Sequence, residues 1–129
     1  SILAARIGKV EKAYQLFMHA TRLDLDDYNN EGEQGLHITS MPGSWLAIVR
    51  GFAGLQIVND MLKIEPVLPE KWNSYSFKVN YSGSTLHIQV SKEIKIGLTA
   101  GNKLNIQVYQ NVYELKQEGS LTIPLKDSF

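Results

Sequence analysis

Hydrophobic residues recur at helical spacing in the first part of the chain. Between residues 9 and 25 a helical spacing is set by Val10, Ala13, Tyr14, Phe17, Met18 and Thr21, and Leu23 and Leu25 close the run. A second helix is predicted over residues 41–52, with Gly54 as its terminator. The short apolar run 2–7 before Gly8 is typical of the last turns of a helix, and we interpret its beginning as missing from this sequence.

After Gly54 the spacing of apolar residues changes from 3.6 to 2, which is typical of strands. Residues 55–58 and 61–64, joined by Asn59-Asp60, predict a hairpin. Four further alternating runs follow, at 75–81, 86–90, 94–98 and 104–108, with turns marked by Gly83, Gly101 and Gly119. The fold class is therefore predicted to be α+β: two N-terminal helices and then an antiparallel β-sandwich-like domain of six or more strands over about residues 55–125.

Composition narrows the class of protein. The chain has 129 residues with 13 basic and 13 acidic side chains, so it offers no basic surface field for nucleic acid. No apolar run approaches the roughly 20 residues that span a bilayer. The absence of cysteine excludes disulfides and thiolate metal sites and favours a cytoplasmic location. Two helices beside a sandwich leave apolar helix surface uncovered, which suggests a piece of a longer protein.

The start of the second helix is the strongest candidate for chemistry. Ser40 or Met41 stands at the expected N-cap, and Pro42 suits the first turn because it lacks an N–H group. The helix is therefore expected to begin between Ser40 and Pro42.

An oxyanion suits such a helix start. The N–H groups of Gly43 and Ser44 are expected to lack a carbonyl partner, and the helix dipole places positive charge beside His37, Thr39 and Ser40. Phosphate is the anion that this environment favours. The structural alternative is that Ser40 only caps the helix and that His37 only fills a loop.

No metal site is predicted. An EF-hand calcium loop begun at Asp24 places Asn29 where glycine is needed and Gly35 where the bidentate glutamate belongs, so the acidic cluster is expected to be solvated or to cap. His19 and His87 have no partner at ligand spacing and are interpreted as surface or structural residues.

Four blocks of sequence carry a resemblance to a known family: RLDLDDYN at 22–29, GLHITSM at 35–41, GSWLAIV at 43–49 and GFAG at 51–54. With Leu68-Pro69, Trp72 and Tyr75-Ser76-Phe77, they make the chain resemble glycoside hydrolase family 65, above all its maltose phosphorylase-like members, over about residues 1–95. The resemblance implies that residues 1–53 end an (α/α)6 catalytic barrel and that residues 54–129 form the C-terminal β-domain. Pro42 stands where alanine or glycine is the commoner residue of the family.

The resemblance also implies a reaction. Inorganic phosphate, as co-substrate and without a further cofactor, attacks the anomeric carbon of a maltose-type disaccharide while a glutamic acid protonates the leaving sugar. The products are β-glucose 1-phosphate and glucose. That glutamate belongs to the barrel upstream, so this chain holds no catalytic residue and is expected to be inactive alone. His37, Thr39, Ser40 and the Gly43 backbone are the residues implied for phosphate, and the family precedent favours a homodimer.

Other functions remain open at this stage. A family 65 hydrolase would use water in place of phosphate. A carbohydrate-binding domain would stack sugar rings on the aromatic residues Trp72, Tyr75, Tyr81 and Tyr109, although aromatic residues in strands more often pack within the protein. A purely structural β-domain is compatible with the phosphorylase.

Overall fold

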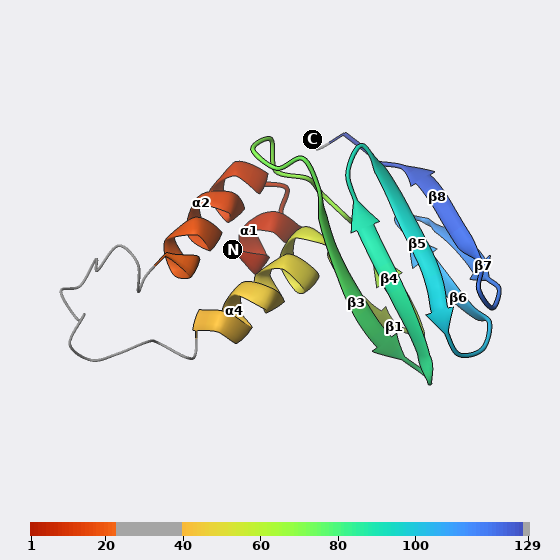
Figure 1. Cartoon of the computed structure of the whole chain (residues 1–129). Coiled ribbons are helices and arrows are strands. Elements are labelled where there is room, and N and C mark those ends of the chain that lie inside the picture. The colour runs from red at the N-terminus through yellow and green to blue at the C-terminus, as the bar shows by residue number, and fades with distance from the viewer. Residues whose placement is uncertain (23–39, 128–129) are drawn as a thin grey trace.

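The computed structural model describes residues 1–22 and 40–127. Its helical segments are α1 (Ile2–Arg6), α2 (Val10–Thr21), α4 (Ser40–Leu46) and the π-helix η2 (Ala47–Phe52). Its strands are β1 (Gln56–Val58), β2 (Met61–Ile64), β3 (Tyr75–Tyr81), β4 (Ser84–Val90), β5 (Glu93–Ala100), β6 (Leu104–Val108), β7 (Asn111–Leu115) and β8 (Ser120–Pro124). Figure 1 shows the helices gathered beside a two-layered sandwich. The α+β class with a C-terminal β-sandwich is thus confirmed.

The helices form where the apolar spacing predicts them. Helix α1 ends at Arg6, and Gly8 just beyond it adopts a φ of 76° that suits glycine and donates its N–H to the Ala5 carbonyl at 3.0 Å. Helix α2 buries Ala13 and Phe17, whereas the last residues of the predicted 9–25 helix lie outside the described residues. The predicted 41–52 helix corresponds to α4 and η2, which run on from one another.

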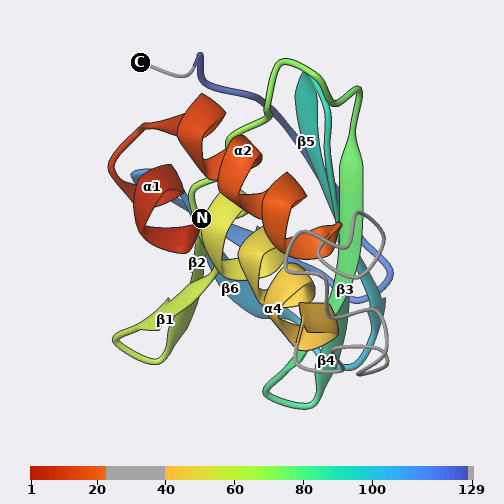
Figure 2. The same ribbon diagram turned by 90° about the vertical axis from the view of Figure 1, so that its left-hand side faces the viewer.

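The predicted hairpin is present and protrudes from the body of the molecule (Figure 2). Asn59 and Asp60 have φ angles of 50° and 58°, the left-handed values that a two-residue type I′ turn requires. Strands β1 and β2 pair in antiparallel register, with Val58 opposite Met61. The Tyr81 hydroxyl donates to the Asp60 carbonyl at 2.6 Å, which ties the hairpin tip to strand β3.

The strands form two four-stranded sheets, with orders β1-β2-β6-β7 and β3-β4-β5-β8. One pair departs from the antiparallel prediction, because β2 and β6 run parallel with Leu62 opposite Ile106. The chain leaves the first sheet after β2, builds β3 to β5 in the second sheet and returns as β6. The direction in which it returns depends on these crossings, which the alternation of side chains does not encode.

The core lies between the sheets. Its largest fully buried side chains in the strands are Leu62, Ile64, Leu86, Ile88, Val90, Ile94, Ile96, Leu98, Ile106 and Leu115. Gly83 and Gly101 turn the chain at φ angles of 76° and 93°, as their positions in the sequence predict. Within residues 1–22 and 40–127, no helix is long and apolar enough to cross a membrane.

Candidate functional site

The described part of the predicted phosphate site is the first turn of α4. The described helix begins at Ser40, and Gly43 is exposed, with no heavy atom of the described residues within 4 Å of the position that a Cβ would occupy. His37 and Thr39 lie outside the described residues, as does the side chain of Ser40. The structure therefore brings together only the backbone of Ser40 and Gly43 from the predicted set.

The first turn of the described helix bears on the expected N–H donors. Pro42 lies in this turn and has no N–H group to donate. Gly43 follows it and is exposed. Ser44 has an interaction partner, and the expected availability of the Gly43 and Ser44 N–H groups to an anion stays a prediction.

The second half of this helix is wider than an α-helix. Over Ala47–Phe52 the backbone is a π-helix, and beyond it the Ala53 N–H donates to the Ile48 carbonyl, five residues back, at 2.8 Å. Gly51 faces α1 so closely that an added Cβ would lie 3.4 Å from the Ile2 Cα. Single π-helical turns are frequent at functional sites because they shift the side chains that follow them.

The end of η2 is hydrogen-bonded to the β-domain. The Phe52 carbonyl accepts from the Val67 N–H at 2.8 Å, and the Ala53 carbonyl accepts from the Glu65 N–H at 3.1 Å. These carbonyls at a helix end would otherwise lack protein partners. Gly54 follows with a φ of 62°, and an added Cβ would lie 2.9 Å from the Glu65 carbonyl oxygen. The helical part and the β-domain are therefore in direct backbone contact.

The aromatic residues considered for sugar stacking pack within the protein. The Trp72 ring makes tilted or edge contacts with four other rings, at centroid distances of 5.0 Å to Phe52, 5.3 Å to Phe17, 5.8 Å to Tyr75 and 5.9 Å to Tyr14. Tyr75 is buried, and its hydroxyl donates to the Val67 carbonyl at 3.0 Å. These contacts support the packing interpretation of Trp72 and Tyr75 over sugar binding.

Tyr109 is likewise engaged. Its hydroxyl donates to the Pro66 carbonyl at 2.7 Å and accepts the Lys126 N–H at 3.3 Å, and the Lys126 ammonium lies 4.8 Å from the ring centroid. Burial raises the pKa of the Tyr109 phenol, and the charge of Glu65 adds to this, although the Lys126 hydrogen bond opposes it. Burial raises the pKa of Tyr75 much further. Both phenols are therefore neutral at pH 7 and act as hydrogen-bond donors.

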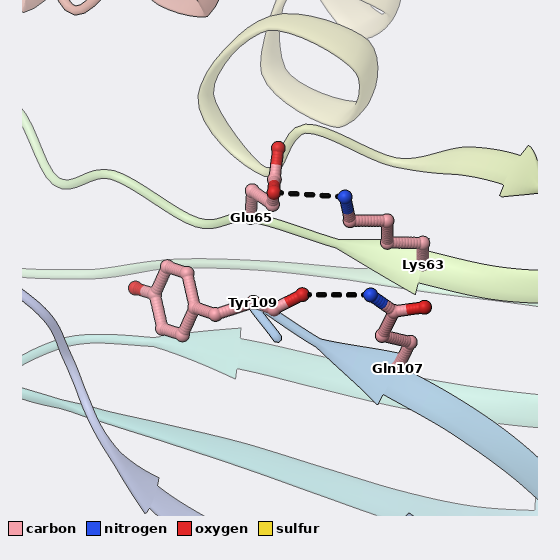
Figure 3. A network of polar contacts seen from close by, with 4 residues as sticks. All are labelled: Lys63, Glu65, Gln107 and Tyr109. Carbon is pink, nitrogen blue, oxygen red and sulfur yellow. Dashed lines mark hydrogen bonds and ion pairs between the residues drawn. The ribbon is translucent and has the colours of Figure 1, made fainter. Parts of the chain in front are cut away.

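A cleft of about 730 Å³ lies where α1, the end of η2 and the sandwich meet. Its lining includes Arg6, Gln56, Glu65, Tyr109 and Lys126. Figure 3 shows two polar contacts at its edge: the Lys63 ammonium lies 2.9 Å from a Glu65 carboxylate oxygen, and the Gln107 amide donates to the Tyr109 carbonyl at 2.9 Å. The lining holds two basic side chains, Arg6 and Lys126, and two acidic ones, Glu65 and Asp127, so its formal charge is balanced.

The described residues contain no group of three or more His, Cys, Asp or Glu side chains that could hold a metal ion. The acidic stretch from Asp24 lies outside them.

The sequence did not predict that the end of the π-helix is hydrogen-bonded to residues 65–67. Gly54 marks the helix end in the sequence, but a glycine there indicates a turn and does not indicate which segment lies against it.

The chain folds into a helical segment and a two-sheet β-domain, and the last turn of the helical segment is hydrogen-bonded to the β-domain. Residues 1–46 match the model of the glycosyl hydrolase family 65 central catalytic domain, and residues 55–115 match that of the glycosyl hydrolase family 65 C-terminal domain. The chain belongs to glycoside hydrolase family 65.

Its relatives include several phosphorylases. The chain is 46% identical over 111 residues to a maltose phosphorylase of Bacillus subtilis (strain 168), covering 85% of this chain and 15% of that protein. It is 41% identical over 124 residues to an alpha,alpha-trehalose phosphorylase of Geobacillus stearothermophilus, covering 95% of this chain and 16% of that protein. A solved structure named "Putative kojibiose phosphorylase from human microbiome" superposes with a TM-score of 0.89 and 40% identity, over 99% of this chain and 19% of that one. The chain thus spans less than a fifth of the relatives it matches.

Proposed function

We propose that this chain is the C-terminal part of an inverting disaccharide phosphorylase that cleaves a maltose-type α-glucoside with inorganic phosphate. The observation that carries the proposal is its similarity, across most of its length, to proteins named as phosphorylases of maltose and of trehalose. Both names are those of phosphorylases, and they differ in the sugar. A segment common to both is therefore expected to contribute to phosphate binding. Maltose is the first substrate to assay.

Within this chain, His37, Thr39, Ser40 and the Gly43 backbone are the proposed phosphate ligands. The helix start at Ser40 supports this, because a helix N-terminus offers N–H groups and partial positive charge to an anion. The open space around Gly43 also supports it, since a bulky anion needs room beside the backbone. A protonated His37 would offset part of the phosphate charge through a charge-assisted hydrogen bond.

The reaction then needs residues from outside this chain. Phosphate held at the helix start attacks the anomeric carbon, and a carboxylic acid on the opposite side protonates the leaving oxygen. We assign that acid to a glutamate of the upstream catalytic domain. We further propose a cytoplasmic homodimer, on the grounds of the absent cysteines and the family resemblance.

Exposed apolar side chains support a longer protein. Leu3 on α1 and Ile7 just after it are 76% and 67% exposed, and Trp45 on α4 is 51% exposed. Large apolar side chains gathered on helices are typical of surfaces that pack against further structure. We propose that the remaining helices of the catalytic domain cover these exposed side chains. We also propose that residues 1–53 belong to the catalytic domain and residues 54–129 to the C-terminal β-domain.

The test is His37→Ala in the full-length enzyme, with the KM values for phosphate and for maltose measured separately. Loss of a charge-assisted donor costs about 1.5–3 kcal/mol, so kcat/KM for phosphate is expected to fall roughly 10- to 100-fold while the KM for maltose barely changes. His87→Ala, on strand β4, is the matched control and should change neither. Weaker maltose binding with an unaltered phosphate dependence would contradict the proposed site. Glucose release that does not depend on phosphate would identify a hydrolase.

A further inference from the structure

Trp72 links the β-domain to the helical part. It lies in the connection between β2 and β3, and its ring contacts Phe17 of α2 and Phe52 of η2, at 5.3 Å and 5.0 Å between centroids. Phe17 and Phe52 also contact each other at 5.8 Å. The three rings therefore form one closed triangle, in which the β-domain supplies one corner and the helices supply the other two.

The backbone reinforces the same junction. Val67 and Glu65 donate their N–H groups to the last carbonyls of the helical segment, those of Phe52 and Ala53. Val67 is itself held by the Tyr75 hydroxyl at 3.0 Å. The C-terminal end of the segment is thus fixed in position and in rotation, since hydrogen bonds constrain its axis and Trp72 constrains the Phe52 ring.

The fixed end and the proposed phosphate site belong to one continuous segment. Helix α4 runs from Ser40 into η2, which ends at Phe52. Ile48 of η2 lines a cavity of about 410 Å³ together with Trp72. Ile48 follows Ser40 by about 12 Å along the helix axis, at 1.5 Å per residue. A rotation or tilt of the segment at Phe52 is therefore carried directly to its N-terminal turn.

We propose that Trp72 is a positioning residue for phosphate: through Phe52 it holds the 40–52 segment in the orientation that binds the nucleophile. This inference rests on the proposed phosphate site. It assigns a role in the reaction to the β-domain, which contributes no side chain to the phosphate site itself. If loss of the ring contact leaves only a fraction of molecules in the competent orientation, the apparent phosphate affinity falls to that fraction of its original value.

The test measures steady-state kinetics and thermal melting in the full-length enzyme. Trp72→Leu and Phe52→Leu remove the aromatic contact from its two sides while they keep an apolar side chain. Each is expected to raise the KM for phosphate about three- to tenfold and to leave the KM for maltose within about twofold, as a competent fraction of about 0.1–0.3 predicts. The upward shift of the melting temperature produced by inorganic phosphate should shrink in parallel. Trp72→Phe keeps an aromatic ring and should restore the phosphate KM to within about twofold.

Ile88→Val is the control for stability alone. Ile88 is fully buried on β4 opposite Phe77 and Ile96, within the sandwich, so its substitution weakens the β-domain without touching the triangle of rings. An equal increase in phosphate KM for Ile88→Val and Trp72→Leu would overturn the inference, as would an unchanged phosphate KM or a parallel change for both substrates. If Trp72→Leu does not fold, Phe52→Leu decides in the same way.

The His37→Ala variant separates the two proposals. An altered phosphate KM in His37→Ala with none in the Trp72 and Phe52 variants refutes only the positioning role. An unchanged kcat/KM for phosphate in His37→Ala refutes the proposed phosphate site, on which the positioning role depends.

Discussion

Replacing Gly54 by alanine tests the close approach of the helix end to the β-domain. Gly54 is buried with a φ of 62°, and a Cβ there would lie 2.9 Å from the Glu65 carbonyl oxygen and 3.2 Å from the Glu65 nitrogen. Gly83 offers a matched control, because its φ is 76° and no heavy atom lies within 4 Å of the added Cβ. Both substitutions carry the cost of a left-handed backbone, but only Gly54→Ala adds a clash with backbone atoms.

The expected losses of unfolding free energy follow from the cost of the left-handed backbone and the cost of the clash. A left-handed conformation costs an L-residue about 1–2 kcal/mol, and the reduced freedom of the unfolded chain returns about 0.4–1 kcal/mol. Gly83→Ala should therefore lower the free energy of unfolding by about 1 kcal/mol or less. Overpacking adds about 1–3 kcal/mol at Gly54, which gives a total near 2–4 kcal/mol. Gly54→Ala should then lower the melting temperature by roughly 8–16 °C, against about 4 °C for the control.

The assay is urea denaturation, with thermal melting as a second measure. Equal slopes with different midpoints would show that the two variants differ in stability and not in the compactness of the denatured state. Equal losses for Gly54→Ala and Gly83→Ala would refute the close contact between the helix end at Gly54 and Glu65, which follows β2.

Four further outcomes are expected. The 129-residue chain, assayed alone with maltose and phosphate, should release no β-glucose 1-phosphate, and turnover by the purified chain would contradict the assignment of the acid to the upstream domain. Ser40→Ala in the full-length enzyme should lower kcat/KM for phosphate roughly tenfold and melt only a few degrees lower, as loss of a hydroxyl near the helix start costs about 1 kcal/mol. Burial raises the folded-state pKa of Tyr75 and Tyr109, so stability should be retained below about pH 10 and fall as the pH rises above it. Tyr109→Phe removes the hydrogen bond to the Pro66 carbonyl and should lower the free energy of unfolding by about 1 kcal/mol at pH 7. The same variant should lose less stability than the original protein when the pH rises above about 10. An unchanged dependence of stability on alkaline pH would show that other groups cause the loss.

Local chemistry accounts for the parts of the fold that the sequence predicts. The Asn59-Asp60 turn needs only two residues that tolerate positive φ, and both adopt it. The turn between β6 and β7 is different: Tyr109 adopts a φ of 54° without any glycine to indicate it. Its N–H donates to the Ile64 carbonyl at 3.0 Å and its hydroxyl to the Pro66 carbonyl, and both partners lie far away in the sequence.

The π-helical form of η2 could not be predicted for the same reason. The apolar positions place a helix over 41–52, but its width depends on the approach of Ile2 to Gly51 and on the bonds from residues 65 and 67. The candidate site was predictable only in part. Residue type and the helix start indicate an anion, whereas the assignment of His37 and Thr39 to phosphate comes from family resemblance and stays a prediction.

The parallel pairing of β2 with β6 has a consequence for the order in which the molecule assembles. Strands β3, β4 and β5 pair in chain order, so this meander forms through short loops, whereas β8 joins the same sheet only after β6 and β7. The β1-β2 hairpin also forms locally, but its other partner arrives only after the three strands of the opposite sheet have been passed, and closing such a long loop is slower. Until β6 docks, β2 presents an open edge that carries Leu62 and Ile64. Substitutions that delay the β3-β4-β5 meander should therefore lower the yield of folded protein by aggregation through this edge, even where the final stability is unchanged.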